Sequence, residues 1–96
     1  MKKTKEILEE TINIVTGQRQ EDYGDKVVNH RNIAELWSAY LDTQIAPHDV
    51  AICMLLVKVA RLKNRKTEDC YIDMAGYAAI AGEINDTDTS TISTSE

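Results

Sequence analysis

The sequence predicts an all-α protein, a compact four-helix bundle in which the third helix is central. Four segments carry apolar residues at three- and four-residue spacing, which is the period of an amphipathic helix. No stretch alternates apolar and polar residues over the length of a strand. The 96 residues, of which 43% are hydrophobic and 28% charged, correspond to one globular domain. We expect this domain at residues 1–84 and a disordered, acidic, Ser/Thr-rich tail at residues 85–96.

The first two helices are expected at residues 4–16 and 26–41. After the first, Gly17 is a stop signal, and residues 18–25 have no apolar periodicity, so we predict a loop there. Asp25 stands where its side chain can accept hydrogen bonds from the first free amides of the second helix. The apolar stripe of this second helix comprises Ile33, Leu36, Trp37, Tyr40 and Leu41.

The third and fourth helices are expected at residues 47–63 and 68–84. Pro47 suits a first helical position because its φ is fixed and it has no amide hydrogen. Residues 50–57 are all apolar, so apolar side chains face every direction, which is typical of a helix buried on all sides. The fourth helix begins after Thr67, a residue type that caps helices. It carries many small residues, which allow close helix approach.

Charged residues on the third and fourth helices form the first candidate site. Lys58 and Arg61 share one face of the apolar third helix. The connection to the fourth helix is short, so the two helices are expected to be antiparallel neighbours. Counting outward from the turn brings Arg61 near Asp69. The same count brings Lys58 near Asp73, and Tyr77 follows one turn later on the same face.

This cluster has two interpretations, because a charge removed from water must be paired or bound to a ligand. In the first, the four charges form a structural ion-pair network that fixes the register of the helix pair. In the second, the cations bind a ligand phosphate or carboxylate, and the acids hold Mg²⁺ or order the cations. Spacing alone leaves both open.

Polar residues around the loop and the second helix form another candidate cluster. Asp25 is either a helix cap or a metal ligand, and His30 is either a packed histidine or a catalytic base. Asn29 lies on the apolar stripe, where a buried amide must find hydrogen-bond partners. Tyr23 offers a ring that can stack on a base. No nucleophile elbow, glycine-rich phosphate loop or HExxH motif is present, so no catalytic residue is assigned.

Charge and apolar runs argue against several classes of protein. The net charge is −5, and residues 85–96 hold three acids and no base, so the body of the chain is nearly neutral. Sequence-independent binding of nucleic acid, which needs clustered Lys and Arg, is therefore not expected. The longest apolar run, residues 50–57, is shorter than the roughly 20 residues of a membrane span, and no secretory signal is visible. We expect a cytoplasmic protein, with Cys53 and Cys70 reduced.

Several ordered motifs resemble a family of small phage and prophage proteins of unassigned function. The resemblance covers residues 19–82 and implies a protein that acts in the cytoplasm of a bacterial host. The motifs are DYGD (22–25), NHRNIAELW (29–37), PHDVA (47–51), KVARL (58–62) and DMAGYAA (73–79).

A more distant similarity involves a Y-G-D loop, a K-x-x-R helix and an Asp-containing helix that ends in a Tyr. This order is similar to nucleotide-modification-associated phage proteins and to the MazG-type all-α nucleoside triphosphate pyrophosphohydrolases. Those enzymes hold Mg²⁺ with ExxE and ExxD motifs. The chain departs from that pattern: its ExxE, residues 6–9, lies in a charged stretch typical of a solvated face, and Asp69 and Asp73 are four residues apart. The departure weakens the case for hydrolysis more than the case for nucleotide binding.

The leading prediction is a protein that binds a phosphorylated nucleotide. Lys58 and Arg61 would contact phosphate, Tyr23 or Tyr77 would stack on the base, and Asn29 and His30 would complete the ligand contacts. In an enzymatic version, Mg²⁺ would activate a water molecule. Its ligands would be Asp25, Asp69 and Asp73.

Two alternatives belong to other classes of protein. The chain could be a non-enzymatic phage anti-defence protein that inhibits a host immune complex by contact or sequesters its nucleotide signal. It could also be a dimerisation module whose charges only fix helix register. In each case the all-round apolar third helix predicts a homodimer or larger homo-oligomer, with Trp37 or the third helix near the interface.

Overall fold

The computed structural model describes residues 2–17 and 25–87, which contain four α-helices and, within those ranges, no strand. The predicted all-α fold is thereby confirmed, and each helix begins at its predicted residue. Residues 18–24 of the predicted loop (18–25) and residues 88–96 of the predicted tail (85–96) lie outside the described ranges. The last helix runs three residues past its predicted end, so residues 85–87 of the expected tail are helical. The helices are α1 (Thr4–Thr16), α3 (Lys26–Leu41), α4 (Pro47–Leu62) and α5 (Glu68–Thr87).

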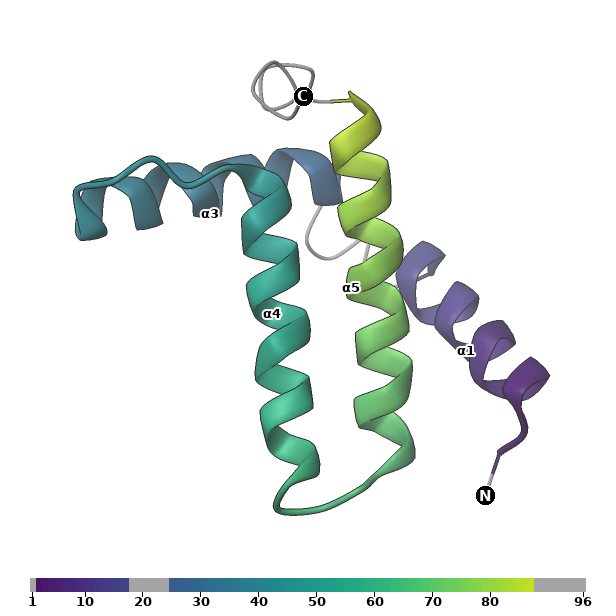
Figure 1. The fold of residues 1–96 in the computed structure, drawn as a ribbon. Coiled ribbons are helices and arrows are strands. Elements are labelled where there is room, and N and C mark those ends of the chain that lie inside the picture. Colours follow the sequence, from purple (N-terminus) through teal and green to yellow (C-terminus); the bar gives the residue numbers. More distant parts are fainter. Residues whose placement is uncertain (1, 18–24, 88–96) are drawn as a thin grey trace.

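The helices are arranged around α5 (Figure 1). α4 and α5 form an antiparallel hairpin, and α1 packs on the other side of α5. α3 crosses the N-terminal end of α4 at a steep angle and projects beyond it, away from α5. α5 contacts all three other helices, whereas α4 contacts only α3 and α5. The prediction that the third helix, α4, is central was therefore wrong.

The chemistry of the helix ends explains where α3 begins and stops. The Asp25 carboxylate accepts hydrogen bonds from the amides of Val27 (2.7 Å) and Val28 (3.3 Å), which confirms its role as a cap. α3 stops at Asp42, which adopts a left-handed φ of 54°, a conformation that Asp tolerates better than most residues. The amide of Ile45 then donates to Ser38 Oγ (2.9 Å), so the connection runs back along α3 towards α4.

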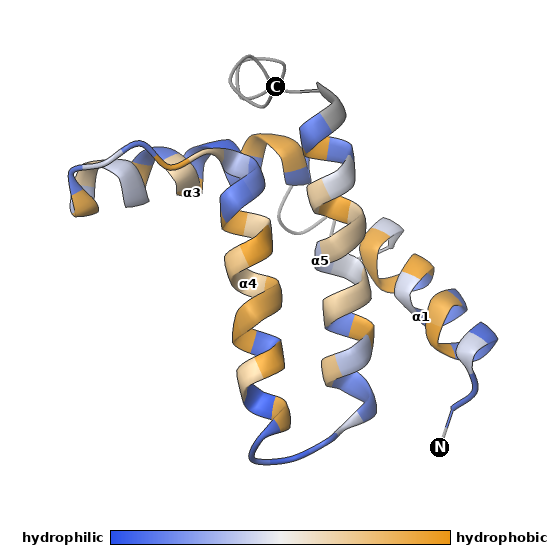
Figure 2. Ribbon diagram, in the orientation of Figure 1, coloured by the Kyte–Doolittle hydropathy of each residue, from blue (hydrophilic) through white to orange (hydrophobic). Residues whose placement is uncertain are grey.

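The buried apolar residues lie on α3, α4 and α5, namely Ala34, Val50, Ala51, Cys70, Ile72, Ala81 and Ile84. The outer side of α4 is different, because Leu56, Val57 and Val59 are exposed. Figure 2 shows apolar residues along most of α4, although, of the described helices, only α3 and α5 pack against it. The predicted burial of this helix on all sides is thus not met within one chain. None of the described helices has the length and apolar character that a membrane crossing requires.

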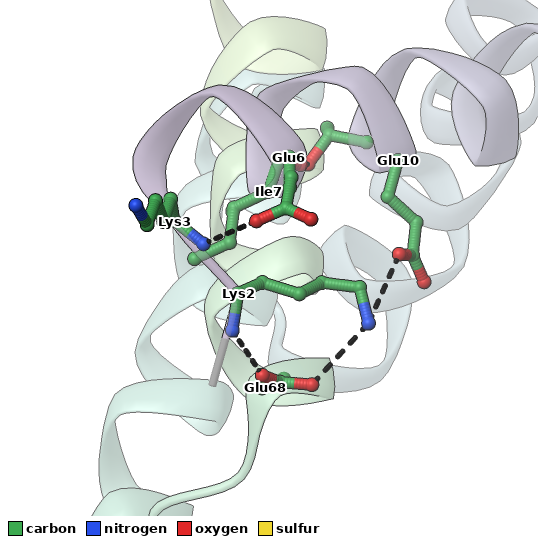
Figure 3. A network of polar contacts seen from close by, with 7 residues as sticks. Lys2, Lys3, Glu6, Ile7, Glu10 and Glu68 are labelled. Carbon is green, nitrogen blue, oxygen red and sulfur yellow. Dashed lines mark hydrogen bonds and ion pairs between the residues drawn. The ribbon is translucent and has the colours of Figure 1, made fainter.

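A polar contact ties the start of α1 to the start of α5 (Figure 3). The Lys2 ammonium lies 3.4 Å from a carboxylate oxygen of Glu68 and 3.4 Å from one of Glu10, and the Lys2 amide donates to the other oxygen of Glu68. Hydrogen bonding by the Lys2 amide, together with the nearby ammonium, lowers the pKa of Glu68. The hydrogen bond to Glu68 and the charges of both acids raise the pKa of Lys2.

Candidate functional site

A pocket of about 400 Å³ lies between α1, α5 and the first turns of α3. Three residues that the sequence singled out as ligand contacts or metal ligands line it: Asn29 from α3, and Asp73 and Tyr77 from α5. Lys26 and Thr11 add polar groups to the wall. The rest of the lining is apolar or small and consists of Ile14, Val15, Ile72, Gly76 and Ile80.

Close approach of α1 to α5 forms one wall of this pocket. A β-carbon built on the buried Gly76 would stand 3.6 Å from a methyl group of Val15 and 3.9 Å from the methyl group of Thr11. The Thr11 hydroxyl donates to the Ile7 carbonyl oxygen within its own helix (2.7 Å), so this buried group needs no partner in the pocket. The α1 side of the pocket is therefore mainly apolar.

The predicted pair of Lys58 and Asp73 is present. Lys58 Nζ lies 3.0 Å from Asp73 Oδ2, and the two side chains are only 16% and 19% exposed. Asp73 lines the pocket, whereas Lys58 does not. Lys58 thus binds one carboxylate oxygen from the α4 side and fixes the carboxylate. In the described part of the chain the other oxygen, Oδ1, has no hydrogen-bond partner, so it can serve a ligand.

The second expected pair does not form. Arg61 and Asp69 are both exposed, and within the described ranges no ion pair joins them. Water solvates both charges, so nothing requires them to meet. Arg61 also does not line the pocket, which removes both predicted phosphate cations, Lys58 and Arg61, from its wall.

The expected ligand set for Mg²⁺ does not assemble either. Asp25 is occupied as the cap of α3, Asp69 is exposed on the first turn of α5, and Asp73 binds Lys58. Across residues 2–17 and 25–87, no three His, Cys, Asp or Glu side chains gather in a way that could hold a metal ion. The three acids were predicted to act as one ligand set from their positions along the chain. In the folded protein they lie in three different surroundings.

His30 is a packed residue. It is buried, and its Nδ1–H donates to the Lys26 carbonyl oxygen (2.7 Å), since a carbonyl can only accept. It does not line the pocket. Of the two interpretations of this histidine, the geometry favours the packed one. The predicted stacking residue Tyr23 lies outside the described residues.

Reasoning from the sequence missed the contribution of Lys26 and of α1. Lys26 is the first residue of α3, a position where a lysine reads as an ordinary surface charge. Thr11 offered a weak signal, because it is a polar residue on a helix face that packs. Gly76 offered a clearer one, since a small residue in a helix allows another helix to approach closely.

Comparison with known proteins places the chain in a family. Residues 6–85 match a family described as a domain of unknown function, DUF6378, and the chain belongs to it. It is 46% identical over 69 residues to the gene 55 protein of Mycobacterium phage L5, and 42% identical over 79 residues to the gene 55 protein of Mycobacterium phage D29. These alignments cover 70% and 81% of this chain but 44% and 52% of the phage proteins, so the chain spans about half the length of the curated relatives it matches.

The expected resemblance to small phage proteins of unassigned function is confirmed by the family and by these two relatives. The more distant similarity to MazG-type enzymes stays a prediction. No solved structure matches the chain.

Proposed function

We propose that this member of the DUF6378 family binds a small phosphorylated nucleotide in the pocket between α1, α3 and α5. One observation carries the proposal: Asn29, Asp73 and Tyr77, each selected from the sequence for its chemistry, line one pocket although they come from different helices. The volume of about 400 Å³ falls within the roughly 300–1,000 Å³ of small-molecule sites.

The lining suits a heterocyclic base better than a purely apolar ligand. The Tyr77 ring offers a face for stacking, which contributes about 1–3 kcal/mol per base in proteins that bind single strands. The Asn29 amide can donate and accept hydrogen bonds. Asp73 Oδ1 can accept from an amino or imino N–H of the base, while Lys58 holds the same carboxylate in place. Apolar groups from Ile14 and Ile80 complete the wall.

For the phosphate, we propose Lys26 in place of Lys58 and Arg61. Lys26 lines the pocket at the N-terminal end of α3, where the helix dipole also favours an anion. The first amides of α3 are already bound by Asp25, so the contact to phosphate would come from the ammonium group. Mg²⁺ would arrive bound to the phosphate oxygens, with its water ligands retained.

A thermal-shift screen tests this proposal, because a ligand that binds only the folded state raises its stability. The panel contains nucleoside mono- and triphosphates and cyclic dinucleotides, each with and without Mg²⁺. A ligand at ten times its Kd stabilises the fold by about 1.4 kcal/mol, which corresponds to a rise in Tm of about 5–10 °C for a domain of this size.

Matched variants locate the site. Asp73→Asn should reduce the shift strongly, whereas Asp69→Asn, an exposed acid on the same helix, should leave it unchanged. Asn29→Ala should also reduce the shift strongly. Asn32→Ala, which changes an exposed residue of the same type on α3, should leave the shift unchanged. If no nucleotide in the panel shifts the Tm, or if both members of each pair lose binding equally, the proposal fails.

The alternative role of sequestering a nucleotide signal of host defence would use the same pocket, so the cyclic dinucleotides in the panel address it. A shift with a cyclic dinucleotide alone would favour sequestration. A shift with triphosphates alone would favour a role in nucleotide metabolism.

A further inference from the structure

The outer face of α4 carries an apolar stripe that no part of residues 2–17 or 25–87 covers. Cys53, Leu56, Val57 and Ala60 follow one another at three- and four-residue steps, so they lie on one side of the helix. All four residues are exposed, and the exposed fractions of Leu56 and Val57 are 56% and 48%. No charged residue interrupts the stripe over its two turns.

A second uncovered stripe lies on α3. Asn29, Ile33, Leu36 and Tyr40 are spaced by four, three and four residues and therefore share one face. At the start of this face, Asn29 lines the pocket against α5. Further along, α3 projects past α4, and there Leu36 and Tyr40 are 70% and 88% exposed (Figure 1). The same face thus passes from a covered position at its start to an uncovered one at its end.

We propose that a second copy of this chain docks in the angle between α3 and α4. The two α4 helices would pack antiparallel about a twofold axis that passes between Leu56 and Val57. Each α3 would then project over the partner's α4, since α3 leaves the hairpin on the side away from α5. The docking surface consists of Leu36 and Tyr40 on α3 and the α4 stripe, and none of these residues lines the nucleotide pocket.

The pattern of the α4 stripe favours a copy of the same chain. Its side chains follow the order small, large, large, small, which reads the same in both directions. In an antiparallel pair, Leu56 meets Val57 and the small Cys53 meets Ala60, so the surface is complementary to itself, as a twofold interface must be. A partner of another kind would not require this symmetry.

The exposed area also fits a homodimer. At roughly 200 Å² for each large side chain, the exposed parts of Leu36, Tyr40, Leu56 and Val57 amount to about 500 Å². A standard interface contains about 800 Å² per partner, of which about 65% is apolar in homodimers. The apolar part of such an interface is therefore about 500 Å² per partner, which equals the exposed area of these four side chains. A patch of this size is at the upper end for a free monomer.

Light scattering on the full chain at about ten micromolar tests the assembly, with an expected mass of twice 10.8 kDa. Leu56→Glu should weaken the dimer at least about 100-fold, as expected when a charge enters the centre of an interface. Leu8→Glu is the matched control, because Leu8 is exposed to a similar degree but lies on α1. It should remain a dimer. Circular dichroism checks that both variants keep their helices.

A cross-link tests the orientation. Ala60→Cys places a new thiol opposite Cys53 of the other copy, so oxidised glutathione should convert the variant into a disulfide-linked dimer. Adding Cys53→Ser should abolish this product. The unmodified chain should not cross-link, because its two Cys53 residues would be separated by about 10 Å along the helix axes.

A monomer at ten micromolar would overturn the proposal and leave this surface to a different protein. A dimer that survives Leu56→Glu would overturn the assignment of the interface. Rapid disulfide formation by the unmodified chain through Cys53 would show that the two α4 helices pair in another orientation or register, and would overturn the arrangement. None of these outcomes depends on whether nucleotides bind.

Discussion

Neutralising the ion pair between Lys58 and Asp73 separates its structural role from its role in the pocket. The pair is close (3.0 Å) and its side chains are mostly buried, at 16% and 19% exposed. Breaking a fully buried pair costs about 3–5 kcal/mol, because one charge is left in the interior, whereas an exposed pair contributes about 0.2–1 kcal/mol. Lys58→Met leaves Asp73 at a pocket that water can enter, so we expect an intermediate cost of about 2 kcal/mol.

The double variant, Lys58→Met with Asp73→Leu, fills the same space with apolar side chains and strands no charge. We expect its free energy of unfolding to lie within about 1 kcal/mol of the parent chain. Asp73→Leu leaves Lys58 without its partner at similar burial and is expected to cost about as much as Lys58→Met. Urea unfolding followed by circular dichroism, applied to both single variants and to the double variant, therefore gives a coupling energy expected at about 3 kcal/mol. A coupling energy below about 0.5 kcal/mol would refute the reasoning, because the pair would then behave as an ordinary surface contact.

The same variants separate the two interpretations of the cluster. The double variant should fold yet lose nucleotide binding, since the carboxylate that lines the pocket is gone, whereas Lys58→Met alone keeps that carboxylate and should retain part of the binding. If the double variant binds nucleotide as the parent chain does, the pair serves only the architecture and Asp73 is not part of the site.

Three further predictions concern stability. Asp25→Ala removes two hydrogen bonds to the start of α3 and should cost about 1 kcal/mol in urea unfolding, while Asn32→Ala, at an exposed position inside the same helix, should not lower the stability. Gly82→Ala should stabilise the fold by about 0.5–1 kcal/mol, because alanine favours a helix interior and its methyl group would meet nothing within 4 Å; a loss of stability would contradict the packing around α5. Glu68→Gln should lower the Tm near pH 7, and the difference from the parent chain should shrink as the pH is lowered below 4.5. The contact with Lys2 lowers the pKa of Glu68 from 4.5, so its contribution is present above that pH and disappears as the pH falls through the lowered pKa. Melting curves between pH 3 and pH 7 check this, and an equal difference at both ends would refute it.

Local patterns determined the helices themselves. Asp25, Pro47 and Thr67 mark helix starts through the hydrogen-bonding and φ preferences of single residues, and these signals need no knowledge of the rest of the chain. The pairing of Lys58 with Asp73 was equally accessible, because a short connection between two helices fixes which residues face each other.

The sequence also determined which chemical groups were available for a site, but not which of them meet. Asn29, Asp73 and Tyr77 were among the candidates, and so were Arg61 and Asp69, which remain in water. Whether a candidate lines the pocket depends on how α1 and α3 pack against α5. Those contacts join residues far apart along the chain, and periodicity within one helix contains no information about them.

The position of the central helix was decided only by the tertiary structure. α4 is the most continuously apolar segment, and hydrophobicity alone therefore predicted it at the centre. In the structure α5 takes that place: it contacts all three other helices, and the small Gly76 lets α1 approach its axis closely. Close packing depends on the shape of the surfaces as well as on their hydrophobicity. Much of α4 is consequently left apolar and uncovered within one chain.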